Sequence, residues 1–121
     1  AQADVVFVVT PLTPETEGLI GADELAALPD GALLVNVSRG KVVDTDALVE
    51  AVRGGRIRAC LDVTDPEPLP SDHPLWTLPG VLISPHCGGQ ADCFFPRIHR
   101  LLRDQLARFA AGERLANIVA E

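Results

Sequence analysis

The chain has 121 residues, of which 47% are hydrophobic and 22% charged, a composition typical of one soluble globular domain. Its formal net charge of -7 argues against a nucleic-acid partner, because phosphate binding needs clustered Lys and Arg. Its apolar runs fall far short of the ~20 residues that a membrane span requires, and the first residues lack the basic segment of a signal peptide. We therefore expect a cytoplasmic protein without a membrane partner.

Short apolar strands are predicted at four places in the chain. Residues 4–10 (DVVFVVT) are typical of a strand that is buried on both faces, as in a parallel sheet. Further strands are predicted at residues 32–37, 57–63 and 81–84.

Helical segments alternate with these strands. "GADELAAL" (21–28) has leucines at helical spacing, and residues 44–55 have Asp44 or Thr45 as the N-cap and a Gly54-Gly55 stop. Residues 64–80 form a loop with five prolines, which Leu75 and Trp76 are expected to anchor. A long amphipathic helix is predicted from about residue 92 to residue 111.

This alternation predicts an α/β fold with a mostly parallel, doubly wound, Rossmann-like sheet that ends in a long helix. The first strand begins within three residues of the start of the chain, and such a small parallel sheet would be poorly covered. We therefore interpret residues 1–91 as part of a domain and expect the missing part upstream.

Unusual residues follow the strands at the edge where parallel sheets bind ligands. Arg39 follows the second strand, Glu67 the third and His86 the fourth. Each could be structural on its own: a surface arginine, a loop carboxylate and a hydrogen-bonded structural histidine. Together they favour function, because arginine suits bidentate capture of a carboxylate and a His–Glu pair suits proton transfer near neutral pH. The three cysteines (60, 87 and 93) and the histidines follow no metal-ligand spacing, so no metal site is expected.

Three segments, "VNVSRGKVVDTDAL", "LDVTDPEPLP" and "ISPHCGG", resemble the D-isomer-specific 2-hydroxyacid dehydrogenases, and the resemblance extends over essentially all 121 residues. It implies that Arg39 holds the substrate, that Glu67 pairs with the histidine and that His86 is the general acid/base. It also implies an NAD or NADP cofactor and a small 2-keto or D-2-hydroxy acid substrate. The implied cofactor contacts are Thr10, Pro11, Val37, Ser38, Arg39, Asp62, His86, Gly88 and Gly89, with glycine at 88 and 89 so that the backbone can approach the ring.

The G-x-G-x-x-G phosphate loop of that family does not occur in these 121 residues. The resemblance therefore implies the C-terminal half of an NAD(P)-binding domain (1–91), and a helix and tail (92–121) that pack toward a substrate domain. It implies a homodimeric parent enzyme and a fragment that is inactive alone. The alternative is an NAD(H)-sensing binding protein on the same scaffold, similar to dehydrogenase-like corepressors.

Overall fold

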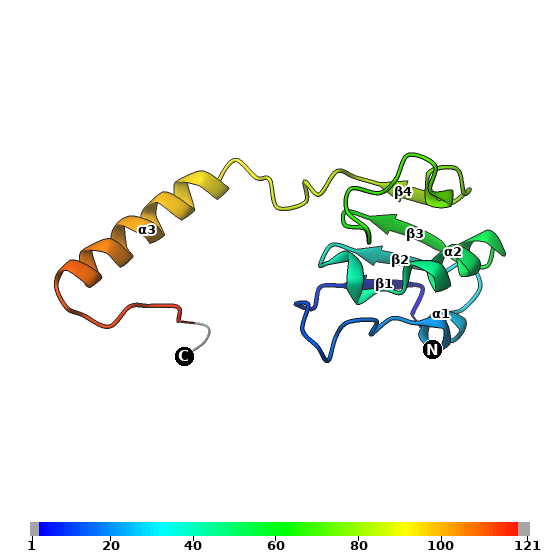
Figure 1. Ribbon diagram of the computed structural model, residues 1–121, viewed down its shortest axis with the longest axis horizontal. Helices are drawn as coiled ribbons and strands as arrows, with labels where there is room; N and C mark the ends of the chain where they lie inside the picture. Colours follow the sequence, from blue (N-terminus) through cyan, green and yellow to red (C-terminus); the bar gives the residue numbers. More distant parts are fainter. Residues whose placement is uncertain (1–2, 119–121) are drawn as a thin grey trace. The chain divides into compact units, whose positions relative to one another are not determined.

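The computed structural model describes residues 3–118, which form two units that divide after Gly88 (Figure 1). The first unit contains one sheet of four parallel strands, which pair in chain order. These strands are β1 (Val5–Val8), β2 (Leu33–Asn36), β3 (Arg58–Leu61) and β4 (Val81–Ile83). The parallel α/β fold predicted from the sequence is confirmed, and each strand is shorter than its apolar run.

Two α-helices and two 3-10 helices connect the strands. The α-helices are α1 (Ala22–Ala26) and α2 (Thr45–Arg53), and the 3-10 helices are η1 (Gly40–Val42) and η2 (Pro74–Trp76). Of the two N-caps proposed for α2, the structure selects Asp44, whose side chain accepts a hydrogen bond from the Ala47 amide. Gly54 is the C-cap, as the glycine pair predicts.

The hydrophobic core lies on one face of the sheet. Leu34 and Ala59 of the sheet are completely buried, and they belong to the same core as Leu25 of α1 and Leu48 of α2. Leu75 of η2 also belongs to this core, whereas Trp76 beside it is half exposed. Leu75 is therefore the main anchor of the proline-rich loop.

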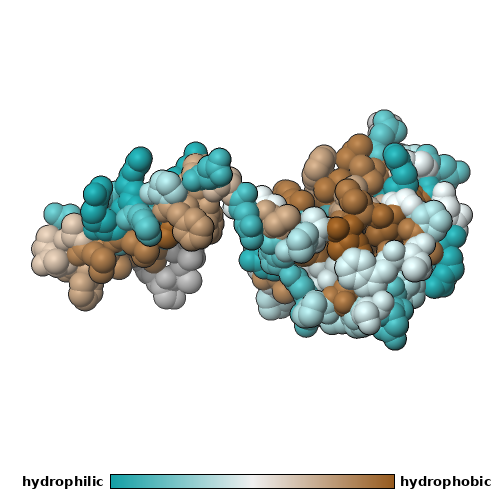
Figure 2. Space-filling view, turned by 90° about the horizontal axis from the view of Figure 1, so that it is seen from above, coloured by the Kyte–Doolittle hydropathy of each residue, from teal (hydrophilic) through white to brown (hydrophobic). Residues whose placement is uncertain are grey.

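The other face of the sheet is apolar but uncovered, so the prediction that the first strand is buried on both faces is wrong for this chain. Phe7 is 65% exposed and Leu82 is 66% exposed. Val5, Val9 and Val37 are exposed as well. An apolar run identifies a strand whose two faces can both be buried, but it does not supply the layer that buries the second face. Apolar surface is also visible on this unit in Figure 2.

The second unit contains α3 (Phe94–Ala110), which is slightly shorter than the predicted helix. None of its residues is buried, and one side of the helix is apolar while the other is hydrophilic (Figure 2). The exposed apolar residues are Phe94, Phe95, Leu101, Leu102, Leu106 and Phe109. After Gly112, Ala116 donates its amide proton to the Gln105 side chain, 3.0 Å away. The last residues of the predicted tail, 119–121, lie outside the described residues. No helix within residues 3–118 is both long and apolar enough to cross a bilayer.

Two leucine substitutions distinguish the two faces of the sheet. We expect Leu34→Ala to lower the free energy of unfolding by about 2–5 kcal/mol, because it leaves a cavity in the core. Leu82→Ala removes the same atoms from the uncovered face and should change the free energy of unfolding by less than about 1 kcal/mol. Urea denaturation of the 121-residue chain measures both values. An equal loss in the two variants would mean that the second face is covered in solution.

Candidate active site

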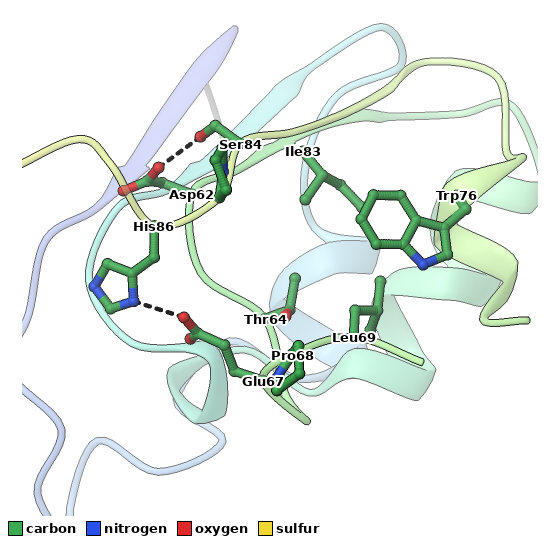
Figure 3. A pocket seen from close by; sticks show the side chains of 10 residues that line it. Asp62, Thr64, Glu67, Pro68, Leu69, Trp76, Ile83, Ser84 and His86 are labelled. Atoms are coloured by element: carbon green, nitrogen blue, oxygen red, sulfur yellow. Dashed lines mark hydrogen bonds and ion pairs between the residues drawn. The ribbon is translucent and has the colours of Figure 1, made fainter. Parts of the chain in front are cut away.

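Glu67 and His86 form a hydrogen-bonded pair at the edge of the sheet where the strands end (Figure 3). His86 Nδ1 lies 2.6 Å from Glu67 Oε1. Both side chains are more than 40% exposed, and exposed ion pairs contribute only about 0–1 kcal/mol to stability. The pair is therefore better explained by chemistry than by folding.

The contact with Glu67 also determines which ring nitrogen is free. A carboxylate only accepts hydrogen bonds, so Nδ1 carries the proton and donates it to Glu67. Nε2 is then left to exchange a proton with a bound molecule. This is the arrangement of an oriented general acid/base.

An apolar pocket lies behind the pair, on the side of Glu67 (Figure 3). Leu69, Trp76 and Ile83 line it together with Glu67 and His86. The indole Nε1 of Trp76 donates to the Pro70 carbonyl at 2.8 Å, which connects η2 to the earlier part of the proline-rich loop. The loop that carries Glu67 is thus supported from within the unit.

Asp62, directly after β3, is buried and accepts hydrogen bonds from the loop that carries His86. Its Oδ1 accepts from Ser84 Oγ at 2.6 Å and from the Cys87 amide at 2.9 Å, and its Oδ2 accepts from the Gly88 amide at 2.8 Å. The Ser84 hydrogen bond is the largest of the effects that hold the pKa of Asp62 below its usual value, although burial opposes them. Asp62 is therefore a carboxylate at neutral pH, with about one of its four acceptor positions still open.

Asn36 shapes the turn that carries Arg39. This buried side chain accepts from the Ser38 amide and hydroxyl at 3.0 and 2.8 Å, and donates to the Arg39 carbonyl at 3.0 Å. Among residues 3–118, all three hydrogen bonds of the Asn36 side chain thus go to the segment 38–39. The Arg39 guanidinium donates to the Ser38 carbonyl at 2.7 Å and remains exposed.

Gly40 allows the loops after β2 and β3 to approach each other. A Cβ at position 40 would lie 1.9 Å from the Thr64 carbonyl oxygen, so only glycine fits. Thr45 of α2 also donates to the Asp65 carbonyl at 3.0 Å. The turn that carries Arg39 and the loop that carries Glu67 are consequently in direct contact.

A second hollow lies at the ends of β1 and β2, lined by Thr10, Pro11, Val37, Ser38 and Arg39 with their neighbours. Thr10 Oγ1 is buried and has no hydrogen-bond partner within residues 3–118. A buried hydroxyl without a partner is costly unless a ligand supplies one. These residues, five of the predicted cofactor contacts, therefore fit a polar ligand at this position.

The structure brings some of the predicted site residues together and leaves others apart. His86 contacts Glu67, and Asp62 contacts the backbone at positions 87 and 88. Within residues 3–118, the hydrogen bonds of Arg39 connect it to the segment 36–42 and not to Glu67 or His86.

The two predicted cofactor glycines differ. A Cβ at Gly88 would lie 2.8 Å from Asp62 Oδ2, so a larger residue there would have to displace the Asp62 carboxylate. A Cβ at Gly89 would meet nothing within 4 Å among the described residues. Nowhere within residues 3–118 is a group of three or more His, Cys, Asp and Glu side chains arranged to hold a metal ion.

Sequence reasoning missed Asn36 and Ser84, whose side chains position the residues it did find. The signal for Asn36 was a polar residue inside the apolar run "ALLVNV". Ser84 ends the run "VLIS" and gave no such signal, because its partner Asp62 is 22 residues away in the sequence.

Comparisons with known proteins agree on one family. The family model described as "D-isomer specific 2-hydroxyacid dehydrogenase, NAD binding domain" matches residues 1–88. Glyoxylate reductase/hydroxypyruvate reductase of Homo sapiens is 42% identical over 122 aligned residues, which cover 100% of this chain and 35% of the human protein. Glyoxylate reductase of Aeropyrum pernix is 40% identical, over 98% of this chain and 36% of that protein.

Solved structures show the same similarity. The D-isomer specific 2-hydroxyacid dehydrogenase of Xanthobacter autotrophicus, in complex with NADPH and MES, superimposes with a TM-score of 0.87 at 44% identity, over 97% of this chain and 48% of that one. D-lactate dehydrogenase of Lactobacillus jensenii with NAD+ has a TM-score of 0.88 at 29% identity, over 99% of this chain and 40% of that one. This chain therefore spans less than half the length of each of these relatives.

The close approach at Gly40 gives a testable expectation. Gly40→Ala places a methyl group against the Thr64 backbone, which must move, so we expect the free energy of unfolding to fall by about 1–3 kcal/mol. Gly89→Ala is the matched control, because its added methyl group meets no described atom within 4 Å. Urea denaturation of the two variants tests this. A Gly40→Ala protein as stable as the control would show that the two loops are not in contact in solution.

Proposed function

The chain belongs to the D-isomer specific 2-hydroxyacid dehydrogenase family, and we propose that the whole protein is an NAD(P)-dependent oxidoreductase that interconverts a small 2-keto acid and its D-2-hydroxy acid. The observation that carries this proposal is the 2.6 Å contact between Glu67 and His86 at the ligand-binding edge of an NAD-binding domain. Glyoxylate and hydroxypyruvate are the first substrates to test, because the similar human protein is named for both.

His86 is the general acid in the reductive direction. Its Nε2 donates a proton to the substrate carbonyl oxygen as negative charge develops there, and takes the proton back in the oxidative direction. Glu67 holds the ring through Nδ1 and stabilises the positive charge of the protonated imidazole.

Arg39 binds the substrate carboxylate and polarises the carbonyl. Its planar guanidinium can form two parallel hydrogen bonds with a carboxylate, which orients the keto carbon. One of its nitrogens is held by the Ser38 carbonyl, so the side chain is partly preorganised for this task.

The nicotinamide end of NAD or NADP would be held by the hollow that contains Thr10 and Ser38, and by the open acceptor position on Asp62. When bound, the nicotinamide supplies or accepts the hydride. The unpartnered Thr10 hydroxyl is the feature of this structure that supports such binding. The 121 residues contain no G-x-G-x-x-G loop for the pyrophosphate, so we expect the isolated chain to be inactive.

The apolar surfaces of both units support a larger assembly. The relatives contain further residues that this chain does not span. We propose that the corresponding residues of the whole protein cover the exposed face around Phe7 and Leu82. The apolar side of α3 would pack against a substrate domain in the same way. Uncovered apolar area of this kind is typical of interfaces. A homodimer is the proposed oligomeric state.

The function is tested by assaying the whole protein with glyoxylate, hydroxypyruvate and pyruvate in the presence of NADH or NADPH. We expect His86→Ala to lower kcat by about 10²- to 10⁴-fold, as for loss of a general acid. Glu67→Gln should lower kcat by less than His86→Ala does, because the amide oxygen can still accept from Nδ1 and orient the ring but no longer places a negative charge beside it. Glu50→Gln, at an exposed residue of α2 paired with Arg53, is the control and should leave kcat unchanged. Absence of turnover with all three acids, or an unchanged kcat for Glu67→Gln, would contradict the proposal.

The role of Arg39 is tested by Arg39→Lys in the whole protein. Lysine keeps the charge but loses the planar fork, so KM for the keto acid should rise and kcat should fall. Thermal stability should change little, because the Arg39 side chain makes a single hydrogen bond within residues 3–118, to the neighbouring Ser38 carbonyl. Arg53→Lys, at an exposed arginine of α2, is the matched control. Normal kinetics in the Arg39→Lys enzyme would remove Arg39 from the mechanism.

A further inference from the structure

We propose that Ser84 is a positioning residue for His86, acting through Asp62: its hydroxyl fixes the buried carboxylate that holds the backbone on the far side of the histidine. This inference deepens the proposed function and rests on it for the role of His86. The geometry that supports it stands on its own.

Ser84 is held firmly at the end of the sheet. It follows β4 directly, and its amide donates to the Leu61 carbonyl at 2.8 Å, which continues the pairing with β3. This pairing places Ser84 beside Asp62, the residue after Leu61, and its hydroxyl donates to Asp62 Oδ1 at 2.6 Å. A hydrogen bond this short to a carboxylate belongs to the strong, charge-assisted class.

The same carboxylate binds the chain after His86. The amides of Cys87 and Gly88 both point at Asp62 and donate to its two oxygens. The residue before the intervening Pro85 and the two residues after His86 therefore converge on one side chain. Asp62 closes a loop in which His86 is the central residue.

His86 needs such support, because its backbone lies in an uncommon conformation. Its φ of 50° falls in the left-handed region, which residues with a Cβ seldom occupy. Its amide donates to the Ser84 carbonyl at 3.0 Å, so the turn begins at the same serine. Conformations of this kind persist when the surroundings enforce them, and they concentrate at functional sites.

The hydroxyl of Ser84 also affects the charge of the anchor. Burial raises the pKa of Asp62, and the Ser84 hydrogen bond is the largest effect that lowers it. An ionised carboxylate accepts from two amides more strongly than a neutral acid does. Removing the hydroxyl should therefore weaken both amide contacts as well as its own.

A purely structural serine would behave differently. If Ser84 only extended the β3–β4 pairing, the hydrogen bond of its backbone amide would be sufficient. Its side chain could then be removed without effect on the loop that carries His86. The side chain is decisive if the inference is correct. The two cases are separated by a pair of substitutions at this position.

The experiment compares Ser84→Ala, which removes the hydroxyl, with Ser84→Thr, which keeps it. Thr77→Ala is the matched control, because it deletes another hydroxyl, one that donates to the Pro74 carbonyl in the same unit. Amide hydrogen exchange of the 121-residue chain is followed by NMR at Cys87 and Gly88, with the core amide of Ala59 as the reference for overall unfolding. Steady-state kinetics of the same variants are measured in the whole protein.

We expect Ser84→Ala to accelerate exchange at Cys87 and Gly88 about tenfold more than at Ala59, as loss of a hydrogen bond to a charged group implies. In Ser84→Thr and Thr77→Ala, the exchange rates at these amides should equal those of the unsubstituted chain. In the whole enzyme, Ser84→Ala should lower kcat about tenfold, because the histidine is misplaced, while Ser84→Thr and Thr77→Ala should leave kcat unchanged.

Equal acceleration at all three amides, or no acceleration, would overturn the inference, and so would a Ser84→Thr protein that behaves like Ser84→Ala. A kcat that is unchanged in Ser84→Ala would overturn it as well. If amide exchange responds as expected but the unsubstituted whole protein turns over none of the three keto acids, the proposed function fails. The role of Ser84 and Asp62 in holding the backbone around His86 is then still supported.

Discussion

Parallel pairing of the four strands in chain order determines where each proposed functional side chain lies. In such a sheet the carboxyl ends of all strands meet at one edge, so a residue that follows a strand is placed at that edge. Arg39, Asp62 and His86 each follow a different strand within a few residues. The loops between strands can therefore differ in length and sequence while the chemistry stays at the same place.

Within this frame, the exposed and buried polar groups have different tasks. The Glu67–His86 pair is accessible, as a site that exchanges protons with a bound molecule must be, and it contributes little to folding. Asn36 and Asp62 are buried and use their hydrogen bonds to shape the backbone that presents the exposed residues. Because an unpaired buried polar group is costly, these two side chains define the turns more strictly than apolar packing would.

The sequence was sufficient to predict the four strands and the three α-helices, but not the 3-10 helices η1 and η2. The apolar runs gave the strands, and Asp44 and Gly54 gave the ends of α2, because both signals are local. The run around Phe7 did not predict the uncovered face of the sheet, since burial depends on a layer that an apolar run does not specify. The poor cover was predicted instead from the small size of the parallel sheet. The same limit applies to the supporting contacts: Ser84 and Asp62 meet across two strands, and the need for Gly40 arises from the Thr64 backbone.

Trp76 is the single tryptophan of the sequence, and it lies on the wall of the pocket behind Glu67. Its indole is half exposed and is hydrogen-bonded to the Pro70 carbonyl of the loop that carries Glu67. Fluorescence emission from the 121-residue chain, excited at the red edge of tryptophan absorption, therefore comes from one known location next to the candidate site. A change in its intensity or wavelength reports on the proline-rich loop without a label, and the second unit, which has no tryptophan, contributes no signal of its own.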